Sequence, residues 1–161
     1  MIDRKRTACF TGHRNIPTHH RQQLTELLDR MIETLYSRGV VFYGAGGAYG
    51  FDMEAEKAVL RARDWHPDIR LILVLPCRDQ DKYWTAENRA VFAEMLQMAD
   101  KIVYTKESYC RGCMHKRNRH LVDYSGYCIA YLTENSGGTA YTVEYAKQNG
   151  LKVVNLAAYL R

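Results

Sequence analysis

The run IRLILVLP at residues 69–76 constrains the fold more than any other part of the sequence. Apart from its arginine the run is apolar at every position, so a strand built from it would be buried on both faces. Strands buried in this way occur in parallel sheets whose two faces are covered by helices. The run therefore predicts an α/β protein.

Strand-like and helix-like segments alternate from one end of the chain to the other. Apolar runs of strand length predict strands at residues 7–12, 40–44, 69–76, 101–105, 127–133 and 152–156. Apolar residues at helical spacing predict helices at about residues 24–35, 52–63, 85–98 and 139–148. Right-handed crossovers then give a Rossmann-like, doubly wound, mainly parallel sheet of about six strands. Because no linker or repeat interrupts the pattern, we expect residues 1–161 to form a single domain.

The composition favours a soluble protein of the cytosol. No apolar run approaches the ~20 residues that a membrane-spanning helix needs, and the N-terminus has no apolar signal core, so we expect no membrane contact. The five cysteines are odd in number, which favours free thiols in a reducing compartment. The formal net charge of +5 favours anionic partners such as nucleotides, but it is too small to indicate nucleic-acid binding by itself.

Glycines gather where three predicted strands end. TGHR (11–14) ends the first strand, GAGGAYGFD (44–52) the second and SGGT (136–139) the fifth. The carboxyl ends of parallel strands meet at one edge of the sheet, where ligands of open α/β sheets bind. Glycine lets the backbone approach a ligand, and the first amides of the next helix attract phosphate. The pattern predicts a phosphate or nucleotide site with charged groups and hydroxyls from His13, Arg14, Thr139 and Thr142.

Some of these features also have a simpler interpretation. Glycine at a strand-to-helix turn often serves only to turn the chain, and no segment matches the fingerprint G-x-G-x-x-G or carries a P-loop lysine. Asp52 is predicted first of all as the N-cap of the second helix, and any ligand role would concern a ribose hydroxyl. Tyr49 or Phe51 could stack on a base, although aromatic residues beside a turn more often pack against the protein.

The segment YCRGCMHKRNRHLVD at residues 109–123 is strongly basic, and residues 106–118 form the longest stretch without predicted structure. A solvated basic face is the ordinary interpretation, and contact with nucleic acid stays open. A zinc site would need the set Cys110, Cys113, His115 and His120. A second cysteine pair is missing and the last histidine falls in a predicted helix that faces elsewhere, so we expect no metal. A redox role is disfavoured because the cysteine pair does not open a helix directly after a strand, and we expect no cofactor.

The chain carries, in this order, TGHR, GAGGAYGFDMEAEKAVL, RNRHLVDYS and SGGTAYTVEYA. In this combination it resembles the YpsA-like family of the SLOG superfamily, which also contains DprA and the LOG phosphoribohydrolases. The resemblance extends over nearly the whole chain and implies a Rossmann-like fold with a pocket for a nucleotide-type ligand. It also implies the ligand-binding residues, which are Gly12, His13, Arg14, Gly46, Gly47, Gly50, Asp52, Arg117, Asn118, Asp123, Gly137, Gly138, Thr139 and Thr142.

The sequence departs from the LOG enzymes at one position. Those enzymes carry the pattern P-G-G-x-G-T-x-x-E, whose glutamate serves catalysis. If Thr139 is aligned with the threonine of that pattern, the glutamate position is Thr142. The nearest acid downstream, Glu144, lies about 200° further around the helix and points away from the pocket face. Cleavage of an N-glycosidic bond would then need another acid, and Asp52 is the candidate.

The leading interpretation is a cytosolic protein that binds a nucleotide or nucleotide-derived small molecule, as a sensor or regulator. Arg14 and Arg117 would carry the charge that binds phosphate. One alternative is a phosphoribohydrolase-like nucleotide hydrolase. The other is a DprA-like binder of single-stranded nucleic acid, which would need a continuous basic groove with exposed aromatic side chains. The sequence leaves open whether the protein forms a homodimer.

Overall fold

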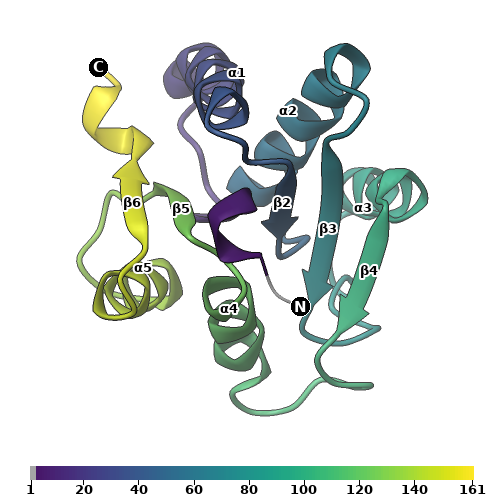
Figure 1. Cartoon of the computed structure of the whole chain (residues 1–161). Helices are drawn as coiled ribbons and strands as arrows, with labels where there is room; N and C mark the ends of the chain where they lie inside the picture. Colours follow the sequence, from purple (N-terminus) through teal and green to yellow (C-terminus); the bar gives the residue numbers. More distant parts are fainter. Residues whose placement is uncertain (1–2) are drawn as a thin grey trace.

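The computed structural model describes residues 3–161, which form a parallel sheet with helices on both sides (Figure 1). The strands are β1 (Thr7–Gly12), β2 (Phe42–Ala45), β3 (Arg70–Leu75), β4 (Lys101–Tyr104), β5 (Tyr127–Tyr131) and β6 (Lys152–Asn155). The α-helices are α1 (Arg21–Ser37), α2 (Phe51–Trp65), α3 (Ala86–Met98), α4 (Cys113–Asp123) and α5 (Gly138–Gln148). Three short 3-10 helices are η1 (Arg4–Arg6), η2 (Thr18–His20) and η3 (Leu156–Tyr159).

The strand order β4-β3-β2-β1-β5-β6, with every pair parallel, confirms the predicted Rossmann-like α/β class. β1 lies in the middle: Cys9 is opposite Gly44 of β2 on one side and opposite Cys128 of β5 on the other. The chain winds outward from β1 to β4 and then returns to the other side of β1 to add β5 and β6. The direction of winding therefore reverses between β1 and β5, and doubly wound sheets bind their ligands at such a point.

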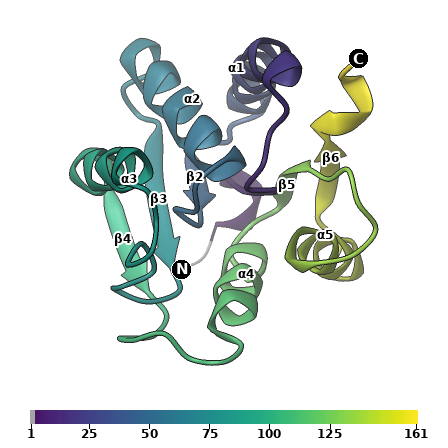
Figure 2. The same ribbon diagram turned by 180° about the vertical axis from the view of Figure 1, so that it is seen from behind.

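Helices cover both faces of the sheet. α1, α2 and α3 lie on one side, whereas α4 and α5 lie on the other (Figures 1 and 2). In β3, Leu73 belongs to the larger core, on the side of the first three helices, and Val74 belongs to the smaller core. The run at residues 69–76 is apolar throughout because both of its faces are buried in this way.

The predicted apolar stripe of the first helix is present in α1. Leu24, Leu28 and Ile32 are fully buried, and Leu35 is nearly so. Residues spaced three and four apart share one face of a helix, so this stripe directs α1 onto the sheet. Gly39 follows the end of the helix with a φ of 93°, a left-handed conformation that glycine adopts readily after a helix.

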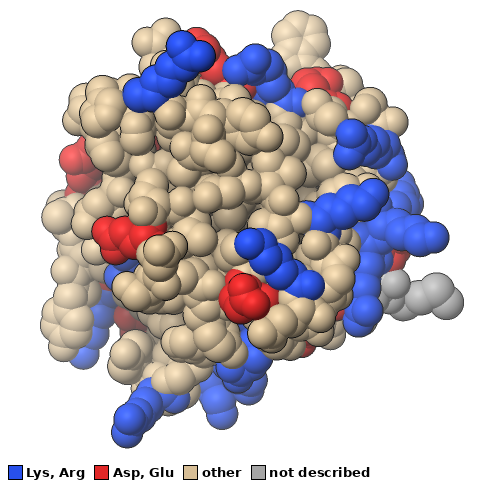
Figure 3. Space-filling model, turned by 90° about the vertical axis from the view of Figure 1, so that its left-hand side faces the viewer, with Lys and Arg blue, Asp and Glu red and all other residues tan. Residues whose placement is uncertain are grey.

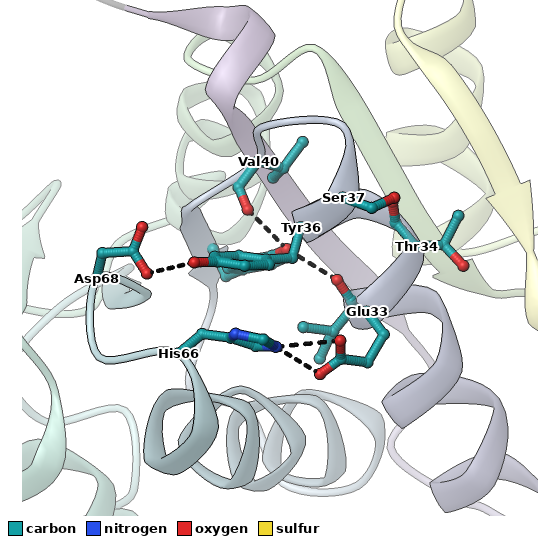
Figure 4. Close-up of polar contacts among 9 residues, drawn as sticks. Glu33, Thr34, Tyr36, Ser37, Val40, His66 and Asp68 are labelled. Carbon is teal, nitrogen blue, oxygen red and sulfur yellow. Dashed lines mark hydrogen bonds and ion pairs between the residues drawn. The ribbon is translucent and has the colours of Figure 1, made fainter.

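A polar cluster lies at the end of the sheet opposite the carboxyl ends of the strands (Figure 4). The Tyr36 hydroxyl donates to Asp68 Oδ1 at 2.7 Å, and His66 Nε2 lies 2.8 Å from Glu33 Oε1. The rings of Tyr36 and His66 stack with their centroids 3.9 Å apart. The cluster joins the end of α1 to the turn before β3, far from the glycine-rich loops.

Several predicted boundaries differ from those of the structure, and three of the differences bear on the loops. The stretch 106–118 was expected to be irregular, but its second half belongs to α4, which begins at Cys113. β2 begins at Phe42 rather than at residue 40. β5 ends at Tyr131 rather than at residue 133, because the Leu132 amide donates to the side chain of Asn155, at 3.0 Å from its Oδ1, instead of continuing the ladder.

The surface around β6, α5 and the C-terminal end is mostly uncharged. Figure 3 shows Lys and Arg side chains mainly around the margin of this face rather than in one basic stripe across it. Within residues 3–161, none of the helices is both long enough and apolar enough to cross a membrane.

Candidate functional site

A polar cavity of about 290 Å³ lies at the point where the winding of the sheet reverses. We call it the first cavity. Its walls come from the end of β1 and the loop after it, the loop after β2, the start of α2, α4 and the start of α5. The lining residues are Phe10, Thr11, Gly12, His13, Arg14, Ala48, Asp52, Met114, Arg117, Asn118, Leu121, Gly138 and Thr139. Eight of the fourteen residues that the resemblance implied therefore meet in one place. Gly46, Gly47, Gly50, Asp123, Gly137 and Thr142 are not among the lining residues.

Asp52 lies in the first turn of α2 and is not its N-cap, so that prediction is wrong. Gly50 occupies the cap position, and Asp52 Oδ2 instead accepts the Ala48 amide at 3.2 Å, within the loop that precedes the helix. The side chain is buried, and burial raises the pKa of its carboxyl, while the nearby charge of Arg117 acts in the opposite direction. Asp52 is therefore a buried carboxyl in the cavity wall.

Arg117 reaches the cavity from α4, but the protein itself uses much of its guanidinium. Nη1 donates to the carbonyl of Gly46, and Nε donates to Asn118 Oδ1 at 2.7 Å. Nη2 lies 3.7 Å from the sulfur of Met114. Burial lowers the pKa of the guanidinium, and the charge of Asp52 raises it. Arg117 thus joins α4 to the loop after β2 and brings a positive charge beside the buried carboxyl.

The glycines at this edge of the sheet fall into two groups. A Cβ atom would collide with protein atoms in the first group, which consists of Gly12, Gly46, Gly47 and Gly50. Close packing within the protein therefore accounts for these four. At Gly137 and Gly138, by contrast, no protein atom lies within 4 Å of the position that a Cβ would take.

The start of α5 forms one rim of the first cavity. Gly138 and Thr139 are the first two residues of this helix, and both line the cavity. The first amides of a helix have no partner within it and carry the positive end of its dipole. Thr142 was expected to offer its hydroxyl here as well, but that hydroxyl donates to the Gly138 carbonyl at 2.9 Å.

His13 and Arg14 follow β1 and have different environments. His13 Nε2 accepts the Thr133 amide at 2.9 Å, which joins the loops after β1 and β5. The guanidinium of Arg14 lies 4.9 Å from the ring centroid of Tyr49. Within residues 3–161 Arg14 forms no ion pair with a carboxylate, so its charge is available to an anion.

Other residues singled out from the sequence lie away from the cavity. Asp123 is exposed at the end of α4, where it accepts the Tyr145 hydroxyl at 2.8 Å. Cys113 is buried, and the His120 ring stacks on Tyr124. Over the part of the chain that the structure describes, no group of three or more His, Cys, Asp or Glu side chains is arranged to hold a metal ion.

Glu56 is a buried carboxyl that the sequence reading missed. It is fully buried one turn after Asp52, and its Oε2 accepts the Gly47 amide at 3.2 Å. Burial raises the pKa of Glu56 well above its ordinary value, and the charge of Asp52 raises it further. A signal was present in the sequence, because the two acids stand four residues apart on a helix face that they share with Ala55 and Val59.

We expect Glu56→Gln to gain stability relative to the native protein as pH rises. A carboxyl whose pKa is raised on folding favours the folded state at low pH. As pH rises above the pKa that Glu56 has in the unfolded chain, the native protein loses up to about 1.4 kcal/mol of unfolding free energy per pH unit. The loss stops once pH passes the pKa that Glu56 has in the folded protein. Glutamine cannot ionise, and its carbonyl can still accept the Gly47 amide. Urea denaturation at about pH 5 and about pH 8 measures the difference.

Glu144→Gln is the matched control, because Glu144 is exposed on α5. Its free energy of unfolding should follow that of the native protein at both pH values. Parallel pH profiles for Glu56→Gln and the native protein would contradict a raised pKa at Glu56.

A second cavity of about 560 Å³ adjoins the first. The two share Arg14 and Met114, and the second is lined by Arg14, Tyr49, Asp79, Gln80, Lys82, Tyr83, Trp84, Tyr109 and Met114. Of the two aromatic residues that the sequence suggested for stacking, Tyr49 lines this cavity. Phe51 is fully buried and packs on Phe10 and Tyr131, so it cannot stack on a ligand.

The fold and the first cavity define a Rossmann-like protein with a polar cavity at the switch point of its sheet. The chain belongs to the YpsA SLOG family, whose model matches residues 9–157, and this confirms the resemblance found in the sequence. It is 29% identical over 142 residues to the uncharacterized SPbeta prophage-derived protein YoqJ of Bacillus subtilis, covering 80% of this chain and 83% of YoqJ. A UPF0398 protein of Halalkalibacterium halodurans is 26% identical over 149 residues, covering 86% and 79%.

Two solved structures share the fold. DNA processing protein A from Helicobacter pylori, described for its single-stranded DNA binding mode, matches with a TM-score of 0.65 and 20% identity, over 91% of this chain and 63% of its own. DprA from Streptococcus pneumoniae matches with a TM-score of 0.64 and 16% identity, over 91% of this chain and 48% of its own. This chain thus spans less than two thirds of either protein, and a likeness at such identity concerns the fold alone.

Proposed function

We propose that this protein binds a phosphate-bearing nucleotide in the first cavity and serves as a cytosolic sensor or regulator. The observation that carries the proposal is the environment of Gly138. This glycine lines the cavity, its φ is not in the left-handed region, and no protein atom lies within 4 Å of the position of a Cβ. Neither the backbone conformation nor the packing of the protein requires glycine at this position. A ligand bound close against the backbone would require it, because a side chain would occupy the ligand's place.

The charges around Gly138 suit a phosphate group. Arg14 offers a guanidinium without a carboxylate partner among the described residues, and the start of α5 offers unpaired amides across the same cavity. Buried Thr139 places a hydroxyl beside them. A phosphate between Arg14 and the start of α5 would receive both kinds of donor. Arg117 is already hydrogen-bonded within the protein. It would therefore contribute positive charge to the site rather than a pair of free N–H donors.

Asp52 is the one carboxylate among the lining residues of the first cavity, all of which lie in the described part of the chain. Its charge would repel phosphate, so we place it near the hydroxyls of a ribose, which are donors that a carboxylate accepts. Glu144 is exposed and lies outside the cavity lining. Because the hydrolase alternative would depend on Asp52 alone, we propose binding without cleavage of the nucleotide.

We expect Gly138→Val to lose nucleotide binding while it remains folded. A branched side chain at the rim would occupy the place of the phosphate, and binding should weaken at least about tenfold, or about 1.4 kcal/mol. The free energy of unfolding should change by less than about 1 kcal/mol, because the new side chain meets no protein atom. Calorimetric titration with a panel of nucleoside monophosphates measures the first quantity, and urea denaturation measures the second.

Ser136→Val is the control, since Ser136 is exposed in the same loop and does not line the cavity. It should bind as the native protein does. The titrated mixtures are then separated by chromatography, where we expect no free base. Normal binding by Gly138→Val would show that the site lies elsewhere, and release of free base by the native protein would favour the hydrolase.

A further inference from the structure

We infer that the second cavity receives the base of the nucleotide whose phosphate lies in the first cavity, an inference that rests on the function proposed above. The two cavities share Arg14 and Met114 as lining residues, so they lie side by side. The second has about 560 Å³ against about 290 Å³ for the first, and aromatic side chains form much of its wall.

Tyr83 and Tyr109 line the second cavity and are largely exposed, although the Lys82 ammonium lies 5.4 Å from the centroid of the Tyr83 ring. Tyr83 is 89% exposed and Tyr109 is 65% exposed. An aromatic ring left in water at the mouth of a cavity offers its face to another flat ring. Nucleobases are such rings, and proteins bind them by stacking on aromatic side chains.

Two other aromatic rings of the second cavity, those of Tyr49 and Trp84, are held by packing. The Trp84 ring meets the Tyr49 ring edge to face, with centroids 5.2 Å apart, and it also packs on Phe92 at 5.4 Å. Arg14 lies over Tyr49 and lines both cavities. A base held by these rings and the two exposed tyrosines would therefore lie beside Arg14, which also lines the cavity proposed for the phosphate.

The occupant is a single free nucleotide rather than a nucleic-acid strand. Taken together, the two adjoining cavities have a volume within the range of pockets that hold one small ligand, roughly 300–1,000 Å³. Basic groups at the second cavity are few, Arg14 and Lys82, and Asp79 opposes them. A strand of several nucleotides would need a longer run of positive charge along its backbone.

Trp84 provides a direct test, because the protein has two tryptophans and the other, Trp65, is 82% exposed and lines a different cavity. In a Trp65→Phe background, Trp84 is the sole tryptophan. We expect adenosine monophosphate to change its fluorescence in a saturable way. Ribose 5-phosphate, which lacks the base, should leave the fluorescence unchanged although it competes with the nucleotide for binding.

Tyr109→Ala and Tyr83→Ala should each weaken binding of the nucleotide about tenfold, in keeping with the loss of one base-stacking contact. Their affinity for ribose 5-phosphate should stay within about twofold of the native value, because the first cavity is untouched. Tyr159→Ala is the matched control: Tyr159 is 66% exposed, as Tyr109 is, but it lies in η3 near the C-terminal end. It should bind both compounds normally.

The outcomes separate this inference from the function on which it rests. If ribose 5-phosphate binds and Gly138→Val abolishes that binding, while the two tyrosine variants bind the nucleotide normally, the base subsite is wrong and the phosphate site stands. If neither compound binds, both proposals fall. If single-stranded DNA changes the Trp84 fluorescence and the mononucleotide does not, the occupant is a strand and the free-nucleotide assignment is overturned.

Discussion

Arg117→Ala is expected to destabilise the protein by about 3 kcal/mol or more, because it would leave a buried carbonyl without its donor and remove a positive charge near a buried carboxyl. The guanidinium is buried, donates to the Gly46 carbonyl and offsets the charge of Asp52. Alanine would leave the carbonyl without its donor and the buried carboxyl without the opposing charge. The free energy of unfolding, measured by urea denaturation, gives the size of the effect.

Two further variants separate the causes. Arg119→Ala on the same helix removes a guanidinium whose only hydrogen bond within residues 3–161 is to the Tyr141 hydroxyl, and it should cost less than about 1 kcal/mol. Adding Asp52→Asn to Arg117→Ala should restore part of the lost stability, because the uncompensated carboxyl is gone. An Arg117→Ala protein as stable as the Arg119→Ala protein would contradict the assigned role.

Gly50→Ala is expected to cost about 3 kcal/mol or more, as the sum of backbone strain and overlap. Gly50 has a φ of 87°, which L side chains rarely adopt, and a Cβ there would collide with the carbonyl of Arg14. The obstacle is backbone and cannot swing aside. Relief would require the loop after β1 to move away from α2, with loss of the hydrogen bond from the Phe51 amide to the His13 carbonyl, 3.1 Å long.

Gly137→Ala is the control for backbone strain alone. Gly137 has a similar φ of 94°, but a Cβ there would meet open space. It should therefore lose only the cost of the strained backbone, about 1–2 kcal/mol. Thermal and urea denaturation of the pair isolate the contribution of the overlap. If Gly50→Ala and Gly137→Ala lost the same unfolding free energy, the loop after β1 would have to move away from the new Cβ at little cost.

The sheet could be predicted because its signals are local. β3 is apolar on both faces and α1 carries an uninterrupted apolar stripe, so each segment contains its own evidence. Of α4, only the part around His120 was predicted to be helical, since Cys113, Arg117 and Leu121 share its buried face. An arginine in the middle of that face breaks the apolar period, and only the Gly46 carbonyl and Asp52, far away in the sequence, explain its burial.

The place of the candidate site was equally predictable, because the carboxyl ends of parallel strands must meet at one edge. The roles of individual residues were not. Gly46 looked like a ligand-approach glycine, yet the room it leaves is filled by the Arg117 side chain. Asp52 looked like a cap, yet it bonds to the loop before its helix. Such roles depend on which distant segment packs where, and spacing along the chain does not encode that.

The central position of β1 has a consequence for the order in which the protein is made. Once β1 to β4 have left the ribosome, these strands can pair with one another. The edge of β1 that pairs with β5 stays unpaired until β5 has been synthesised. An unpaired strand edge in a nascent chain can associate with other chains. α5 is synthesised later than β5, so the first cavity is complete only once the start of α5 has been made. A ligand bound there would stabilise finished molecules and not unfinished ones.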